Sequence, residues 1–133
     1  MNLSAGVGAA VEPIHPTRVL VVEDTESVRA LISYMLRRRG YEVVAVDNGP
    51  EALTRALDDI DVVVMDVGLP GLNGLEVCRR LRAEPATALL PVILLTGRVH
   101  QEDVRDGLRA GANEFLTKPF QEADLMSALK RLS

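Results

Sequence analysis

The chain has 133 residues, of which 47% are hydrophobic and 26% are charged, so its composition predicts one globular domain rather than a disordered chain. A formal net charge of −4 leaves no basic excess for the phosphates of a nucleic acid or for an anionic membrane surface. One cysteine, Cys78, excludes an internal disulfide and a Cys/His zinc site, and no apolar run reaches the roughly 20 residues that a membrane span requires.

The first 16 residues are rich in Gly and Ala and end in Pro-Ile-His-Pro. They show neither a helical nor a strand period, so we expect a flexible N-terminal tail over 1–16 and one ordered domain over 17–133. A secretory signal needs positive charge before its apolar core, and the first basic residue of this chain is Arg18. The segment is therefore not interpreted as a signal peptide.

From Arg18 onward, short apolar runs alternate with amphipathic segments, which predicts strands alternating with helices. The predicted strands are 18–22, 43–46, 61–66, 91–96 and 114–117. The first helix begins with Thr25 as its N-cap and ends at Gly40. Its apolar residues follow the spacing of a single buried face, made of Val28, Leu31, Ile32, Met35 and Leu36.

Four further helices are predicted: one starting at 48–50, one after a Pro/Gly loop at 69–74, and two at 101–110 and 121–132. Their expected inward side chains are Ala52, Leu53, Ala56 and Leu57; Leu75, Cys78 and Leu81; Val104 and Leu108; and Leu125, Met126, Leu129 and Leu132. The helix at 101–110 has the weakest apolar face, which is typical of a marginal, movable element.

Five consecutive β-α units predict an α/β fold with a doubly wound parallel sheet and helices on both faces. The second strand is expected at an edge of this sheet. In open α/β sheets, ligands bind beyond the carboxyl ends of the strands. The residues that follow each strand are therefore the candidates for chemistry.

Three acids, a hydroxyl and an amine lie at the carboxyl ends of four of the predicted strands: Glu23 and Asp24, Asp66, Thr96, and Lys118. Clustered carboxylates resist burial unless a cation lies between them, and oxygen ligands suit a hard divalent ion such as Mg²⁺. We expect Lys118 to pair with Asp66. Each residue alone is weak evidence, but their joint placement predicts a metal and phosphate site.

The segments that carry these residues resemble the CheY-like receiver domain of two-component response regulators, over residues 18–132. The matching segments are Val21–Asp24, Met65–Gly74, Leu95–Gly97 and Gly111–Phe120. The resemblance implies a flavodoxin-like three-layer (βα)5 sandwich with strand order 2-1-3-4-5.

In that family, the aspartate after the third strand accepts a phosphoryl group from a phosphohistidine, which implies this role for Asp66. The resemblance also implies that Glu23, Asp24, Asp66 and the backbone carbonyl of Gly68 hold Mg²⁺, with Mn²⁺ as a substitute. Thr96 and Lys118 would contact phosphoryl oxygens and spread their charge. It further implies a cis Lys118–Pro119 bond. Beyond its own phosphorylation and slow dephosphorylation, no enzyme activity is expected.

The resemblance also implies a switch, in which Thr96 moves towards the phosphoryl group and the aromatic Phe115 turns inward. The responding surface would be the helix at 101–110, the fifth strand and the last helix. Gly68 and Arg98 occupy two positions that tune phosphoryl lifetime in the family. The implied partners are a histidine kinase or histidine phosphotransferase and a protein effector, in the cytoplasm, with the protein a monomer or a weak phosphorylation-dependent dimer.

Three alternatives are compared with a stand-alone regulator. The first is an intermediate in a phosphorelay, which the sequence does not separate from a stand-alone regulator. The second is a receiver excised from a hybrid kinase or larger regulator, which the Met1 start and the loose tail weakly disfavour. A hydrolase that uses an aspartyl-phosphate usually carries a second aspartate two residues after the nucleophile, where this chain has Gly68. The lone His100 is interpreted as a solvated loop residue.

Overall fold

Five strands and five helices alternate along the chain in the computed structural model, which describes residues 16–97 and 101–132. The strands are β1 (Arg18–Val22), β2 (Glu42–Val46), β3 (Val62–Asp66), β4 (Val92–Thr96) and β5 (Glu114–Thr117). The helices are α2 (Glu26–Arg38), α3 (Gly49–Arg55), α4 (Gly74–Ala83), α5 (Gln101–Ala110) and α6 (Glu122–Arg131). The predicted alternation is confirmed, and the strand limits agree within one residue.

The strands form one parallel sheet in the order β2-β1-β3-β4-β5, which confirms the predicted topology and the edge position of β2. The register aligns the strand ends, since Asp66 lies opposite Leu95 and Thr96 lies opposite Thr117. The carboxyl ends of β1, β3, β4 and β5 therefore meet along one edge of the sheet.

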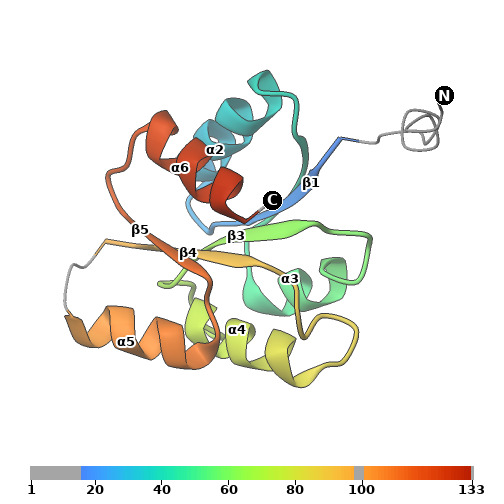
Figure 1. The fold of residues 1–133 in the computed structure, drawn as a ribbon, viewed down its shortest axis with the longest axis vertical. Helices are drawn as coiled ribbons and strands as arrows, with labels where there is room; N and C mark the ends of the chain where they lie inside the picture. The colour runs from blue at the N-terminus through green and yellow to red at the C-terminus, as the bar shows by residue number, and fades with distance from the viewer. Residues whose placement is uncertain (1–15, 98–100, 133) are drawn as a thin grey trace, which may run out of the picture.

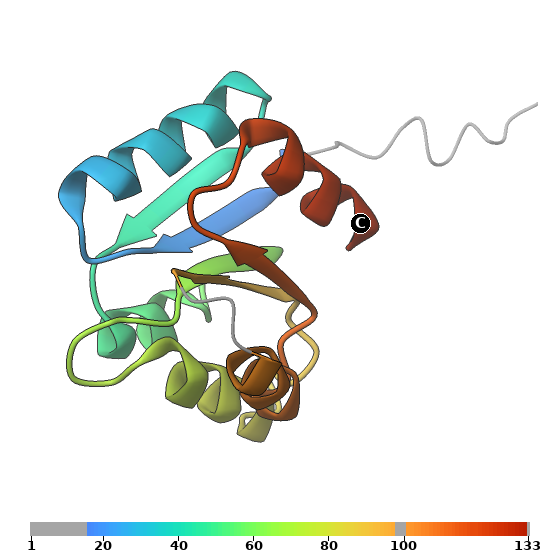
Figure 2. The same cartoon turned by 90° about the vertical axis from the view of Figure 1, so that its left-hand side faces the viewer.

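Helices cover both faces of the sheet, as Figures 1 and 2 show, with α2 and α6 on one face and α3, α4 and α5 on the other. Alternate residues of a strand point to opposite faces, so Val19 and Val21 join the core under α2 and α6, whereas Leu20 and Val22 join the other core. The central strands β3 and β4 are buried on both faces. The sequences of strands buried on both faces are continuous apolar runs.

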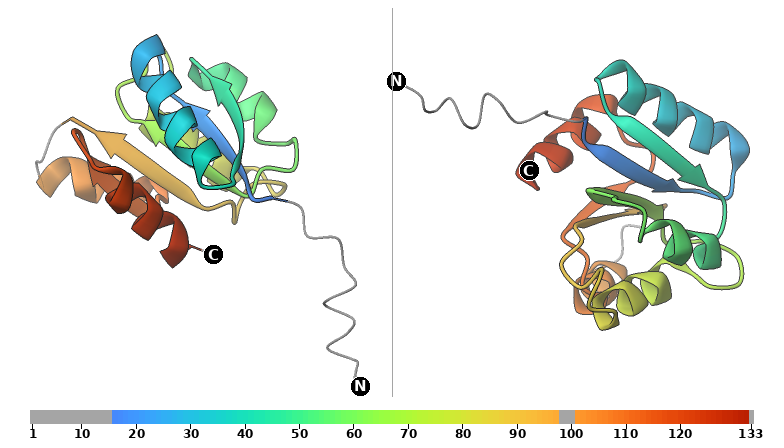
Figure 3. Two further views of the ribbon diagram at one scale, coloured as in Figure 1. Left: turned by 90° about the horizontal axis from the view of Figure 1, so that it is seen from above. Right: turned by 90° about the vertical axis from the view of Figure 1, so that its right-hand side faces the viewer.

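The right-hand view in Figure 3 shows the twisted sheet between the two helical layers. Asn48 and Asn73 cap α3 and α4, because their side chains accept the backbone N–H of Glu51 at 2.8 Å and of Glu76 at 3.0 Å. Thr25 occupies the N-cap position of α2, but its side chain makes no capping bond. Among the described residues, no helix has the length and apolar character that a bilayer span demands.

Three leucines predicted to point inward are exposed instead, by 53% at Leu31, 58% at Leu57 and 54% at Leu108. Leu31 flanks the stripe of α2 that holds Ile32 and Leu36, so it lies at the rim of the contact. Leu57 lies beyond the end of α3 at Arg55, where the helical period no longer directs side chains. In α5 the packed positions are Gly107 and Ala110 rather than Leu108, because the ring of Phe115 lies against Gly107.

Candidate phosphoacceptor and metal site

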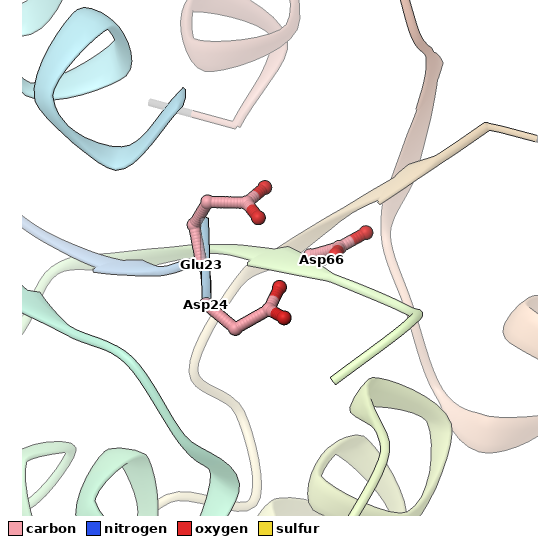
Figure 4. Close-up of side chains that lie close together, drawn as sticks. All are labelled: Glu23, Asp24 and Asp66. Atoms are coloured by element: carbon pink, nitrogen blue, oxygen red, sulfur yellow. The ribbon is translucent and has the colours of Figure 1, made fainter. Parts of the chain in front are cut away.

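Glu23, Asp24 and Asp66 form a carboxylate cluster at the carboxyl edge of the sheet. Each offers one carboxylate oxygen, and these three oxygens lie within 4.8 Å of one another. Figure 4 shows the side chains extending from the end of β1 and from the end of β3 towards a shared region. The convergence follows directly from β1 and β3 being adjacent parallel strands.

Glu23 is the most deeply buried acid of the cluster, with only 1% of its side chain exposed. Its Oε1 accepts a hydrogen bond from Lys118 Nζ at 2.7 Å, and its Oε2 accepts one from the backbone N–H of Thr25 at 3.2 Å. Both oxygens of this buried carboxylate are thus satisfied, as burial requires. The second bond ties the buried carboxylate to the residue that precedes α2.

Lys118 lies closer to Glu23 than to its predicted partner, Asp66. Its Nζ is 3.4 Å from Asp66 Oδ1, an ion pair but a longer one than the 2.7 Å contact with Glu23. Burial alone would lower the pKa of Lys118, but the hydrogen bond to Glu23 and the negative charge of Asp66 outweigh it and raise the pKa. The expected pairing with Asp66 is present, but the stronger contact is with Glu23.

Thr96 is buried at the end of β4, with 6% exposure, beside the residues of the next strand. Its backbone carbonyl accepts the N–H of Lys118 at 2.7 Å, so the two residues are tied through the main chain. The Lys118–Pro119 peptide bond is cis, the conformation that the resemblance implied. The threonine and the lysine therefore reach the same sheet edge as the acids.

Two glycines lie close to Asp66, one against its backbone and one beside its carboxylate. A Cβ at Gly74, the first residue of α4, would overlap the backbone carbonyl oxygen of Asp66, so the helix begins directly against the strand end. A Cβ at Gly68 would lie 3.7 Å from Asp66 Oδ2, in ordinary van der Waals contact. Glycine at 68 therefore leaves that approach to the carboxylate open.

The ring of Phe115 packs against the core on the α5 side of the sheet, and a Cβ at Gly107 would overlap its Cε2 and Cζ atoms. The ring is half-buried and lies between the sheet and α5. Arg98 and His100 lie outside the described residues.

Sequence reasoning missed Arg29, whose guanidinium contacts the loop that carries Glu23 and Asp24. An arginine on an amphipathic helix is ordinarily interpreted as a solvated residue, so the sequence gives no signal that Arg29 contacts this loop. It missed Gly107 as well, because nothing in the local pattern shows which ring a helical glycine faces.

The donor chemistry of the cluster fits a hard divalent cation. Its ligand atoms are carboxylate oxygens, which are the ligands that Mg²⁺ and Mn²⁺ accept. Three carboxylates face one lysine, so the cluster carries an excess of negative charge. Asp24 is exposed, and within the part of the chain that the structure describes its carboxylate makes no hydrogen bond or ion pair that would compete with a metal ion.

A comparison with family models matches residues 19–130 to the response regulator receiver domain. Among curated relatives, the phosphate regulon transcriptional regulatory protein PhoB of Rhizobium meliloti is 39% identical over 116 residues, which cover 86% of this chain and 51% of PhoB. The transcriptional regulatory protein TcrA of Mycobacterium tuberculosis is 41% identical over 100% of this chain and 52% of its own length. The chain thus spans about half the length of these relatives.

Solved structures of receiver domains and response regulators also match this chain. The Vibrio cholerae chemotaxis protein CheY4 matches with a TM-score of 0.84 and 33% identity, over 89% of this chain and 99% of its own. The receiver domain of the Pseudomonas aeruginosa sensor histidine kinase PA1611 matches with a TM-score of 0.82 and 36% identity, over 88% and 97%. A magnesium ion is coordinated in the active-site cleft of that second protein.

Proposed function

The chain belongs to the response regulator receiver domain family of two-component signalling, and on this premise we propose that Asp66 accepts a phosphoryl group from a phosphohistidine. The placement of Asp66 carries the proposal. It is the last residue of the central strand β3, lies within ion-pair distance of Lys118, and faces Gly68, which has no side chain to cover it. Asp24 is exposed and Glu23 is held by Lys118, so neither is as well placed to be the nucleophile.

In the proposed reaction, an Oδ of Asp66 attacks phosphorus and the P–N bond to the donor imidazole breaks. The electron pair of that bond returns to the imidazole nitrogen, which takes up a proton. A carboxylate is a weak nucleophile, so positioning and charge neutralisation supply most of the rate. Lys118, already beside Asp66, would contact one phosphoryl oxygen, and the hydroxyl of Thr96 would contact another.

We assign Asp24 and Asp66, with Glu23 and the backbone carbonyl of Gly68, as the residues that hold Mg²⁺. Bound there, the ion supplies positive charge against the phosphoryl oxygens. The support is the oxygen donor set, its excess negative charge, and the magnesium ion in the related PA1611 receiver domain. Mn²⁺ has the same ligand preference and is expected to substitute.

The proposed partners are a histidine kinase or histidine phosphotransferase on the input side and a protein effector on the output side. The proposed output surface is formed by α5, β5 and α6, where a groove of about 530 Å³ is lined by residues that include Phe115, Phe120 and Ser127. Phosphorylation adds nearly two negative charges at Asp66, which Thr96 and Phe115 would transmit to this surface. We place this signalling in the cytoplasm.

We further propose that residues 17–133 form the receiver domain, whereas residues 1–15 of the expected tail lie outside the described residues. CheY4 is a chemotaxis protein, whereas the PA1611 domain comes from a sensor histidine kinase, so receivers of both contexts share this fold. No observation favours the relay or the excised-receiver alternative over a regulator that acts by protein contact.

The test is intact mass after incubation with a small-molecule phosphodonor, with Mg²⁺ or with EDTA. We expect a phosphoryl-sized gain for the wild type with Mg²⁺, and none with EDTA or in Asp66→Asn. Asp47→Asn is the matched control, because Asp47 is an exposed aspartate after β2 and lies outside the carboxylate cluster. A gain that persists in Asp66→Asn, or that disappears in Asp47→Asn, contradicts the assignment.

A further inference from the structure

Arg29 lies in the first turns of α2 and directs its guanidinium back to the loop between β1 and α2. Its Nη1 donates to the backbone carbonyl of Glu23 at 2.8 Å. The same nitrogen lies 3.5 Å from the carbonyl of Asp24, at the long limit of a hydrogen bond. The side chain is half-buried, so these contacts are less exposed to competing water than those of a surface arginine.

Both carbonyls belong to residues whose carboxylates form the metal cluster. A bond to a backbone carbonyl fixes the orientation of its peptide plane, and the starting direction of the neighbouring side chains depends on that plane. The loop has few other restraints: the N–H of Glu23 donates to Val46 O at 3.1 Å, and the N–H of Thr25 donates to Glu23 Oε2 at 3.2 Å.

Asp24 depends most on this backbone restraint. Glu23 is fixed through its own carboxylate by Lys118 and Thr25, whereas no bond to the Asp24 carboxylate occurs in residues 16–97 and 101–132. The position of Asp24 is therefore set by the peptide that precedes its side chain and the peptide that follows it. Arg29 is the side chain that contacts both carbonyls of this Glu-Asp pair.

We propose that Arg29 is a positioning residue for the metal site, which it preorganises by holding the Glu23-Asp24 backbone, an inference that rests on the proposed function of the carboxylate cluster. Preorganisation lowers the ordering cost that binding otherwise incurs. Simple electrostatics predicts the opposite effect on binding, because removing a cation near a cation site should tighten the binding of Mg²⁺. The direction of the change in affinity therefore separates positioning from charge.

The experiment is calorimetric titration of Mg²⁺ into the wild type, Arg29→Ala, Arg29→Lys and Arg37→Ala. Arg37 is the matched control, because it lies on the same helix, is exposed, and makes no side-chain hydrogen bond or ion pair to any residue that the structure describes. We expect the dissociation constant to rise about tenfold in Arg29→Ala, which corresponds to about 1.4 kcal/mol. Arg29→Lys should remain within about threefold of the wild type because it keeps a charged donor, and Arg37→Ala should be unchanged.

Thermal unfolding in EDTA shows whether each variant is folded. If Arg29→Ala does not fold, Arg29→Gln carries the same expectation of weaker binding. Unchanged or tighter Mg²⁺ binding in a folded Arg29 variant overturns the positioning role, even if that variant is less stable, because a purely structural role would move stability alone. Absence of Mg²⁺ binding in the wild type would instead overturn the metal site itself, and the positioning role with it.

Discussion

The contact between Gly107 and Phe115 predicts that replacing a helical glycine by alanine destabilises this protein. Alanine in a helix interior is ordinarily more stable than glycine by about 1 kcal/mol. Here a Cβ at 107 would overlap Cε2 and Cζ of Phe115 and lie 3.4 Å from Leu94 Cδ1. Overpacking of this kind typically costs about 2 kcal/mol, so Gly107→Ala should lower the free energy of unfolding by about 1 kcal/mol net.

The matched background is Phe115→Leu, because leucine has no atoms equivalent to Cε2 and Cζ. In that background Gly107→Ala should raise the free energy of unfolding by about 1 kcal/mol, giving a coupling energy of about 2 kcal/mol between the positions. Urea unfolding of the wild type, the two single variants and the double variant measures this coupling energy in a double-mutant cycle. A stabilisation of about 1 kcal/mol by Gly107→Ala in both backgrounds would show that the ring does not occupy the space beside Gly107.

Three further predictions concern Lys118, Gly68 and Cys78. Because the pKa of Lys118 is raised above 10.5, its ion pairs stabilise the folded protein below pH 10.5, and this stability is lost as the pH rises through the higher folded pKa. Urea unfolding between pH 9 and pH 12 should show this alkaline loss in the wild type and a smaller loss in Lys118→Met. Gly68→Met places a side chain over Asp66, so the phosphoryl adduct should decay several-fold more slowly by intact mass, and a faster decay would contradict the access argument. Burial raises the pKa of Cys78 despite the opposing charges of Arg82 and Arg79, so a thiol reagent should modify it only in urea, and rapid labelling of the native protein would be inconsistent with that burial.

The architecture, and which residues belong to the site, could be predicted from the sequence because both follow from the order of the strands along the chain. Parallel strands place all their carboxyl ends on one edge, so residues after β1, β3, β4 and β5 must converge there whatever their side chains do. Glu23, Asp66, Thr96 and Lys118 could be assigned to one site on that basis alone, and the structure places them at that edge.

Contacts that depend on side-chain direction could not be predicted in this way. The preference of Lys118 for Glu23 over Asp66 is decided by differences of less than 1 Å between two acids on adjacent strands. Arg29 acts on main-chain atoms five and six residues earlier, which no side-chain pattern encodes. The exposure of Leu108 depends on the ring of Phe115, a residue of a different element.

The most direct test of the central claim is to locate the phosphoryl group on the chain. After incubation with Mg²⁺ and a phosphodonor, borohydride reduces an aspartyl phosphate to homoserine, and fragment spectra of the tryptic peptide 56–79 distinguish Asp66 from Asp58, Asp59 and Asp61 in the same peptide. We predict homoserine at position 66 alone. Homoserine at Asp24 or at another aspartate, with Asp66 intact, would contradict the account.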